Sequence, residues 1–287
     1  MERNLGIDND QGKSCDNKTE VITCRWSGRR GPCRPTAYRY TIRRIMRIPF
    51  PCFKCAMKNG TVDKKNIPFI DIQDGILYEG ECSQGHKTRA TLDQFKHEIL
   101  FELAIQGIIE NYYREAVTNF TGSIERLYEA FIKITIIRKI RDFSVIEDAW
   151  KKVNSQSERQ LGAFIFLYLN NFGELPPSLS NSQVSFRNDV IHKGKIPTKE
   201  ETMKYGNDAL KVMFPVIKNL MDHFENEIYL YKEAERIIAI GGQDNEVLRI
   251  AIGTKLNLTQ DYGRKEPEKI EMMVQNYNGD WLRERGV

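Results

Sequence analysis

Residues 186–194 read FRNDVIHKG, and this stretch gives the clearest indication of a fold and of a site. The glycine at its end predicts a helix that stops just after His192. On such a helix Asn188 and His192 lie four residues apart and share a face, which the long side chain of Arg187 can reach. The stretch therefore predicts a cationic, hydrogen-bonding pocket at a helix end, with one group that titrates near neutral pH.

These side chains suit the cleavage of RNA without a metal, which needs a base for the 2′-hydroxyl, a proton for the leaving oxygen and positive charge at the phosphate. His192 can move the proton. Arg187 can hold the phosphate through its fork of donors, and Asn188 can orient a phosphate oxygen or the imidazole. A simpler interpretation stays open, because a histidine in the last turn of a helix often only complements the helix dipole.

The same residues, Arg187 to His192, resemble the Rx4-6H signature of HEPN-domain ribonucleases in its RNxxxH form. The resemblance covers residues 91 to about 235. It implies an all-α fold, a homodimer whose two motifs face each other, and cleavage of RNA that leaves a 2′,3′-cyclic phosphate. It further implies a role as a toxin or in defence against phage, and an RNA target such as a tRNA anticodon loop.

Two more expectations follow from the resemblance. HEPN proteins often carry an acidic residue on an early helix that points toward the motif, and Glu125 is the candidate for holding Arg187 or His192 in place. The alternative is that Glu125 faces solvent. A single histidine can carry out only one of the two proton transfers that cleavage needs. A homodimer would supply the other by bringing a second His192 across the interface. The sequence does not indicate which partner neutralises such a nuclease.

Composition fits a soluble globular protein with one large or two small domains. The chain has 287 residues, of which 29% are charged, and a net charge of +4. It has no run of about 18 apolar residues, so we expect no membrane span. It also lacks an apolar segment typical of a secretory signal near its start, so we expect the cytoplasm. The six cysteines are then interpreted as metal ligands or free thiols before disulfides.

We interpret residues 1–47 as a basic arm. Eight arginines and no acidic residue lie between Val21 and Phe50. Trp26, Tyr38 and Tyr40 are interleaved with them, a pattern that suits RNA binding through phosphate contacts and stacking. A disordered basic tail without a dedicated role is an alternative, and so is an upstream start that precedes a natural one at Met46.

A zinc ribbon is predicted over residues 48–90. Cys52 and Cys55 form a CxxC pair, while Cys82 and His86 form a CxxxH pair with a glycine in the turn. Strand-like pieces at 68–72 and 76–78 predict a hairpin between the pairs. Four such ligands fill the tetrahedron of a structural zinc ion, so no metal is expected in catalysis. The alternative is that Cys82 and His86 are incidental.

Residues 91–240 predict an antiparallel helical bundle with the motif at a helix–turn–helix junction. A capping box at Thr91–Gln94 is expected to open a helix that continues to Phe120, with His97 on its surface. The sequence Thr121-Gly122-Ser123 is expected to break it. Further helices are predicted at 124–137, 145–153, 158–170, from 180 or 181 to 192, and from 199 onward, past 229 to 240. The helix at 158–170 is apolar nearly all round and is expected to be buried.

The C-terminal extension, residues 241–287, predicts a strand at 247–252 that pairs with 255–258. Taken together, the sequence predicts a mainly α protein, a zinc ribbon fused to a HEPN-like ribonuclease that works without a catalytic metal. P-loop, Rossmann and HExxH motifs are absent from the sequence. Two alternatives remain: a catalytically silent zinc-ribbon module that binds nucleic acid or acts as an adaptor, and a pocket that senses a nucleotide.

Overall fold

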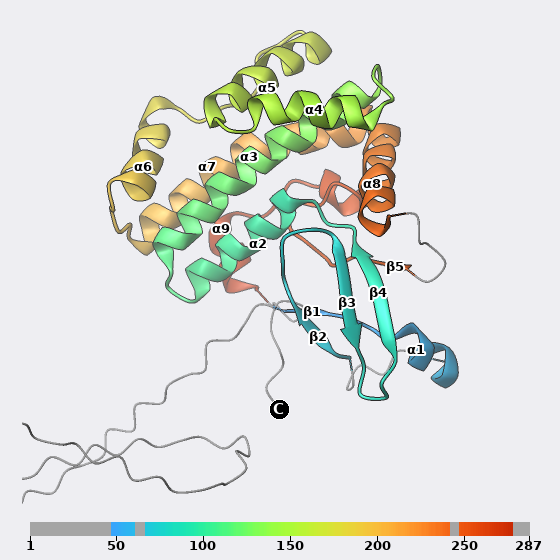
Figure 1. The fold of residues 1–287 in the computed structure, drawn as a ribbon. Coiled ribbons are helices and arrows are strands. Elements are labelled where there is room, and N and C mark those ends of the chain that lie inside the picture. Colours follow the sequence, from blue (N-terminus) through green and yellow to red (C-terminus); the bar gives the residue numbers. More distant parts are fainter. Residues whose placement is uncertain (1–46, 61–66, 242–246, 278–287) are drawn as a thin grey trace, which may run out of the picture. The chain divides into compact units, whose positions relative to one another are not determined.

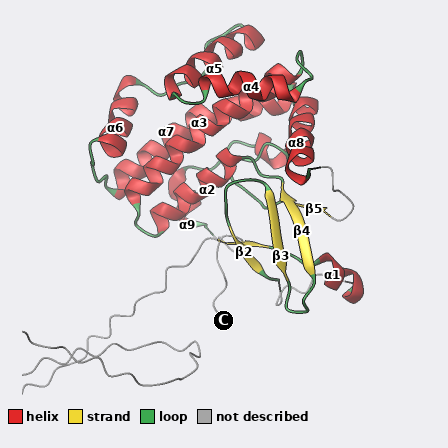
Figure 2. Ribbon diagram, in the orientation of Figure 1, coloured by secondary structure: helices red, strands yellow, loops and turns green. Residues whose placement is uncertain are grey.

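The computed structural model describes residues 47–60, 67–241 and 247–277, which all belong to one compact unit, residues 45–287. The predicted basic arm lies outside the described residues except for its last residue, Arg47. The described part is mainly helical with small sheets (Figure 1, Figure 2), which confirms the predicted class at that level. None of the described helices is both long and apolar enough to cross a membrane.

The strands are β1 (Arg47–Pro49), β2 (Phe69–Asp71), β3 (Leu77–Glu81), β4 (Lys87–Leu92) and β5 (Val247–Ile250). The helices are α1 (Phe53–Asn59), α2 (Lys96–Ile109), α3 (Tyr113–Ile137), α4 (Phe143–Val153), α5 (Ser157–Phe172), α6 (Asn181–His192), α7 (Lys199–His223), α8 (Glu225–Ile240), the short 3-10 helix η1 (Asp261–Arg264) and α9 (Ile270–Gln275). The predicted helices in α4, α5, α6 and the start of α7 are confirmed.

Helix α3 is the centre of the helical part, since α2, α4, α5, α6, α7 and α8 all pack against it. Its apolar side chains point in several directions, and Phe120, Leu127 and Phe131 are fully buried. The ring of Phe164 from α5 lies edge-on to Phe131 and stacks on Tyr128, with centroids 5.1 and 4.1 Å away. A helix that is buried on most sides in this way holds its neighbours through side-chain packing.

The strands form two small sheets. In one, β1 pairs antiparallel with β2; in the other, the order is β3-β4-β5, with β3 antiparallel and β5 parallel to β4. The predicted hairpin between 68–72 and 76–78 is therefore wrong, although both segments contain a strand. The strand predicted at 247–252 is present as β5, but its partner is β4 rather than 255–258.

A small core holds the two sheets together and is separate from the core of the helices. It contains Ile48, Phe50, Tyr78, Ala90, Leu92 and Ile252. Because Ile252 follows β5, the predicted C-terminal extension contributes to the same core as the predicted ribbon segment. The proposed boundaries at residues 90 and 240 thus lie within one compact unit, and they remain predictions about domain organisation.

Two predictions about the first helix are wrong. Residues Thr91 and Leu92 belong to β4, and α2 begins only at Lys96, where the backbone nitrogen of Phe95 donates to the Glu98 carboxylate at 3.4 Å. His97 is fully buried rather than on the surface. The sequence pattern was misleading here because polar residues of α2 are buried by a segment more than 150 residues away.

That segment is the loop that follows β5. The Glu98 carboxylate accepts hydrogen bonds from the Thr254 hydroxyl at 2.5 Å, the Asn257 side-chain amide at 3.0 Å and the Leu258 backbone nitrogen at 3.2 Å. Glu102 accepts one from the Lys255 backbone nitrogen at 2.5 Å. Buried carboxylates with several donors fix the path of a chain, since each unmade bond would be costly.

The helix break occurs at a different place from the one predicted. Helix α2 ends at Ile109, and Asn111 takes a left-handed conformation with φ of 63° before α3 begins. The sequence Thr121-Gly122-Ser123 lies inside α3, where the Thr121 hydroxyl donates to the carbonyl of Val117 at 2.9 Å. The Ser123 hydroxyl donates to the carbonyl of His97 at 2.6 Å instead of capping a new helix.

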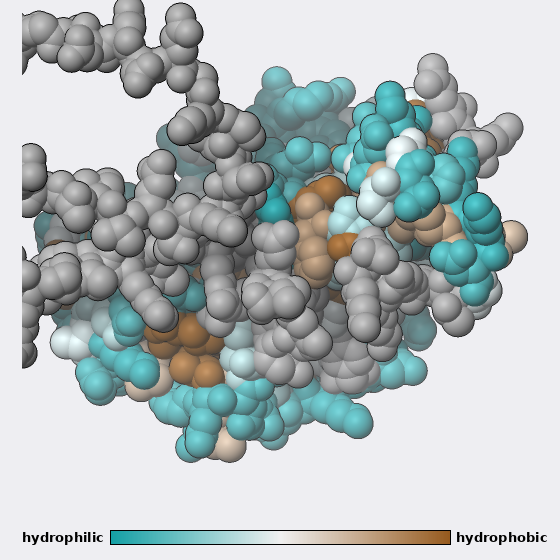
Figure 3. All heavy atoms as spheres, turned by 90° about the horizontal axis from the view of Figure 1, so that it is seen from below, coloured by the Kyte–Doolittle hydropathy of each residue, from teal (hydrophilic) through white to brown (hydrophobic). Residues whose placement is uncertain are grey.

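Two other helices differ from expectation. Helix α5 is not buried all round, because Phe166 is 74% exposed, although Phe164 and Tyr168 are buried. The long helix from 199 stops at His223, and Phe224 separates α7 from α8. On the face drawn in Figure 3, hydrophobic residues are visible in two places among hydrophilic ones. The described surface therefore carries some apolar side chains outside the two cores.

The pH dependence of stability should reveal the buried Glu98. Burial raises its pKa from 4.5 to about 7, although its hydrogen bonds act in the opposite direction. The folded state then keeps a proton that the unfolded state releases, so this group makes the free energy of unfolding fall as pH rises from about 5 to 7. We expect a shallower fall in Glu98→Gln than in the wild type, measured by urea denaturation at several pH values.

Glu115→Gln is the control, because Glu115 is exposed. It should leave the slope of the free energy of unfolding against pH as it is in the wild type. Glu102, whose pKa burial also raises to about 7, adds to the slope in every variant. His97, whose pKa burial lowers to about 3, acts in the opposite sense below about pH 6.5. The test therefore compares the slope of the free energy of unfolding against pH between the two variants. Equal slopes for Glu98→Gln and Glu115→Gln would contradict the prediction.

Two helical glycines provide a matched test of core packing. A Cβ at Gly206 in α7 would lie 2.8 Å from the buried ring of Phe120 and 3.0 Å from Ile270, whereas a Cβ at Gly162 in α5 meets nothing within 4 Å. We expect Gly206→Ala to destabilise the protein by about 1–3 kcal/mol through overpacking. Gly162→Ala should stabilise it by up to about 1 kcal/mol through helix propensity. Thermal denaturation that ranks the variants in the reverse order would contradict this packing.

Candidate functional site

The motif helix α6 has well-defined ends. At its start the Ser180 hydroxyl accepts from the Gln183 backbone nitrogen at 3.4 Å, and the Gln183 side chain accepts from the Ser180 nitrogen at 2.6 Å. At its end Gly194 takes a left-handed conformation with φ of 74°, as the sequence predicts. Val190 is fully buried, which seats the helix on the core.

The structure brings Arg187 and Glu125 together. The Nη1 atom of Arg187 lies 3.7 Å from Oε1 of Glu125 on α3, and the side chains are 22% and 30% exposed. The Nε atom of Arg187 is buried, and within the described residues it has no hydrogen-bond partner. One long ion pair thus holds the guanidinium in a half-buried position, and within the described residues part of its set of donors is unpaired.

Two buried tyrosines lie close to this ion pair. Burial raises the pKa of Tyr128 and of Tyr205. The charge of Glu125 also raises both pKa values, and the charge of Arg187 lowers them. The hydroxyl of Tyr205 lies 3.0 Å from the hydroxyl of Thr121. The ion pair therefore lies beside buried side chains of α3 and α7.

The other two motif residues lie farther out. Asn188 is half-buried, and His192 is exposed at the end of α6. Within the described part of the chain, neither side chain makes a hydrogen bond or ion pair. They lie four residues apart on a helix and hence share a face. Both are therefore open to a ligand that approaches this end of α6.

One cation near the motif is missing from the sequence prediction. Arg114, in the first turn of α3, donates from Nη2 to the carbonyl of Ile191 at 3.3 Å, next to His192. The sequence predicts no helix start here, because its predicted first helix runs on through Arg114 to Phe120. The signal that could have found it is Asn111, since asparagine tolerates the left-handed conformation that ends a helix.

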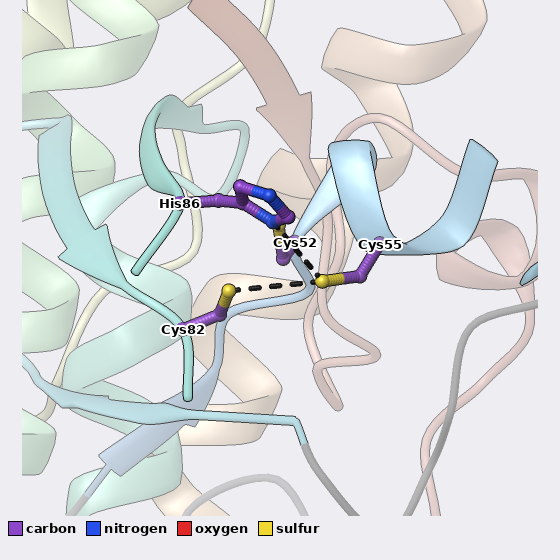
Figure 4. Close-up of side chains that lie close together, drawn as sticks. All are labelled: Cys52, Cys55, Cys82 and His86. Atoms are coloured by element: carbon purple, nitrogen blue, oxygen red, sulfur yellow. Dashed lines mark hydrogen bonds between the residues drawn. The ribbon is translucent and has the colours of Figure 1, made fainter. Parts of the chain in front are cut away.

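The predicted metal ligands form a second cluster. The Nδ1 atom of His86 lies 3.2 Å from Sγ of Cys55 and 3.7 Å from Sγ of Cys52, and the sulfur atoms of Cys55 and Cys82 lie 3.7 Å apart. All four ligand atoms lie within 4.8 Å of one another. Figure 4 shows the three sulfur atoms and the imidazole pointing toward one common place.

Two local structures hold these ligands. Cys52 precedes α1 and Cys55 lies in its first turn. Cys82 and His86 flank the tight turn between β3 and β4, where the Cys82 nitrogen donates to the His86 carbonyl at 3.1 Å and Gly85 has φ of 75°. Each short pair therefore supplies two ligands from a single turn, as the sequence predicts.

The residues fit a tetrahedral metal ion of the zinc type. Zinc–sulfur bonds of about 2.3 Å place neighbouring ligands of a tetrahedron roughly 3.8 Å apart, close to the separations found here. Cys52 and Cys82 are buried, whereas Cys55 and His86 are partly exposed. Burial raises the pKa of Cys52, but hydrogen bonds with Cys55, Cys82 and His86 outweigh it and bring the value to about 6. These four side chains could hold a metal ion.

Comparisons of the chain with protein-family models, with curated proteins and with solved structures find no match. The assignment of function therefore depends on the geometry of the two clusters and on the motif resemblance.

Loss of one metal ligand should weaken both zinc binding and stability. We expect the purified wild type to hold one zinc ion per chain and Cys82→Ser to bind zinc at least about tenfold more weakly, because the tetrahedron is incomplete. Cys24→Ser, outside the ligand set, should behave like the wild type. Competition with a zinc chelator and thermal denaturation measure the two effects, and equal zinc affinity of Cys82→Ser and the wild type would contradict the assignment.

Proposed function

We propose that this protein is a metal-independent endoribonuclease of the HEPN type. The observation that carries the proposal is the arrangement around α6. A half-buried Arg187 is held by Glu125 and keeps free donors, while Asn188 and His192 are open to a ligand on the same helix. The motif resemblance adds to this, since it assigns these residue types to RNA cleavage.

In the proposed reaction, His192 accepts the proton of a 2′-hydroxyl. The 2′-oxygen then forms a bond to the adjacent phosphorus, and the bond from phosphorus to the 5′-oxygen breaks. The products are a 2′,3′-cyclic phosphate and a 5′-hydroxyl end. Arg187 stabilises the negative charge that develops on the phosphate, and Asn188 orients one of its oxygens.

The leaving 5′-oxygen also needs a proton. We propose that His192 of a second copy donates it in a homodimer in which the two motifs face each other. The exposed position of His192 at the end of α6 is compatible with such a shared site. Glu125 acts as a positioning residue in this proposal, because its carboxylate pairs with the guanidinium of Arg187.

Zinc is the metal that we propose for the four-residue cluster, with a structural role. Three cysteines and one histidine complete its coordination and leave no position for a substrate. Cys52, Cys55, Cys82 and His86 would thereby brace the small sheets, in a ribbon-like segment next to the HEPN-like bundle. The resemblance further suggests a cytoplasmic toxin or an agent of phage defence that cuts tRNA.

An alternative is a nucleic-acid-binding module without catalysis. Helix α1 favours it, because this helix has no buried residue and carries Phe53 and Met57 at 52% and 70% exposure. Lys54 and Lys58 lie four residues apart on the same helix, where they could contact phosphates. In this alternative, changes at Arg187 or His192 would leave RNA binding and every other activity unchanged.

Cleavage of RNA by the zinc-loaded protein, with no free divalent metal, tests the proposal. We expect wild-type protein to produce 2′,3′-cyclic phosphate ends. His192→Ala should cleave at least about a hundredfold more slowly, because a group that transfers protons is lost. Arg187→Lys should cleave about tenfold or more slowly, since lysine keeps the charge but loses the fork of donors.

His223→Ala is the matched control, because His223 is also exposed and also lies in the last turn of a helix. It should cleave like the wild type. Circular dichroism and zinc content establish that each variant is folded. Equal cleavage by folded wild-type and His192→Ala protein would reject the mechanism, and a fully active monomer would reject the shared site.

A further inference from the structure

A cavity of about 110 Å³ opens beside the motif helix. Helices α3, α5 and α6 form its walls, together with residues 178 and 179 of the link between α5 and α6. Two of its lining residues are Glu125 and Arg187. This Arg187 cavity therefore begins where the candidate phosphate-binding group is held.

The cavity has apolar walls and a polar rim. Tyr128 and Ile124, both buried, form the wall on α3, and Leu179 and Val184 face it from the link and from α6. The polar residues that also line it, in addition to Glu125 and Arg187, are Thr121, Ser157, Glu158 and Ser178. Apolar walls with a few polar groups at one side suit a flat, unsaturated ring that carries hydrogen-bonding groups on its edge.

Size narrows the choice of ligand. Sites for drug-sized molecules enclose about 300–1,000 Å³, so the Arg187 cavity admits a fragment of one ring system rather than a whole nucleotide. A ring of that kind joined by a short tether to a phosphate is a nucleobase. Single-stranded RNA is recognised in this way, since its unstacked bases turn outward into side-chain pockets.

We infer that the Arg187 cavity receives one nucleobase next to the scissile phosphate and sets a base preference for cleavage. This inference rests on the proposed function, because it takes the phosphate to be held by Arg187. The cavity lies on the Glu125 side of α6, whereas His192 is exposed at the end of that helix. The two sites together hold one nucleotide step, with its base in the cavity and its ribose–phosphate near the motif.

Two serines provide a matched pair of variants. Ser178 and Ser155 are both exposed, but only Ser178 lines the cavity. Ser178→Leu adds an apolar side chain at the mouth, and Ser155→Leu adds the same group elsewhere. Leu161→Ala widens the mouth instead, since Leu161 lines the cavity and is 36% exposed.

The first measurement is binding, which does not depend on cleavage. The four nucleoside 5′-monophosphates and inorganic phosphate are titrated separately into the zinc-loaded full chain. We expect at least one monophosphate to bind about tenfold more tightly than phosphate, because its base enters the cavity. Ser178→Leu should lose this advantage, while Ser155→Leu should keep it.

The second measurement is cleavage of RNA pools, followed by sequencing of the ends. Wild-type protein should prefer particular bases at one position beside the cut, and an abasic ribose at that position should slow cleavage about tenfold. Ser178→Leu should show neither the preference nor the abasic effect. Leu161→Ala should change which bases are preferred.

The outcomes separate the two proposals. If the wild type cleaves RNA and Ser178→Leu matches Ser155→Leu in base preference and in the abasic effect, the cavity is not a base site and the nuclease proposal stands. If the wild type cleaves no RNA but binds a monophosphate more tightly than phosphate, and Ser178→Leu loses this advantage, the cavity binds the base of a nucleotide and the nuclease proposal fails. If the wild type neither discriminates between monophosphates and phosphate nor cleaves RNA, both are rejected.

Discussion

The burial of α3 is the constraint on which the rest of the structure depends. Six other helices pack on it, and fully buried side chains such as Phe120, Leu127 and Phe131 lie along its length. Where neighbouring helices cover α3, its polar groups need partners from those helices. Glu125 is such a group, and its partner is Arg187 of α6. The candidate site is therefore a consequence of how α3 is packed.

A second constraint acts at the start of α2. The buried carboxylates of Glu98 and Glu102 take donors from the chain that follows β5, and the Gln94 side chain exchanges two hydrogen bonds with Ile252, at 2.8 and 2.9 Å. These bonds join the C-terminal segment to the junction between sheet and helices. The Cys–His cluster lies in the same sheet region, so the candidate metal-binding residues and the C-terminal segment both adjoin one small core.

The Cys–His cluster and the motif site around Arg187 differ in how they are assembled and in how buried their residues are. The four candidate metal ligands come from two short segments, residues 52–55 and 82–86, and each segment supplies two of them. The motif site is assembled from three helices, and it becomes more open from Arg187 toward His192. A half-buried cation beside exposed polar groups suits a ligand that is long and charged, since one part can be gripped while another reaches solvent.

The sequence by itself determined what short-range chemistry controls. It determined the ends of α6 and the start of α7, through Ser180, Gly194 and Thr198. It also indicated both pairs of residues that could hold a metal ion, because each pair depends on residues a few positions apart. Tertiary structure alone decided the pairing of β5 with β4, the burial of His97 and Glu98, and the contact of Arg114 with Ile191. In each of these the partner is distant in the chain, so local patterns of polarity give the wrong environment or none.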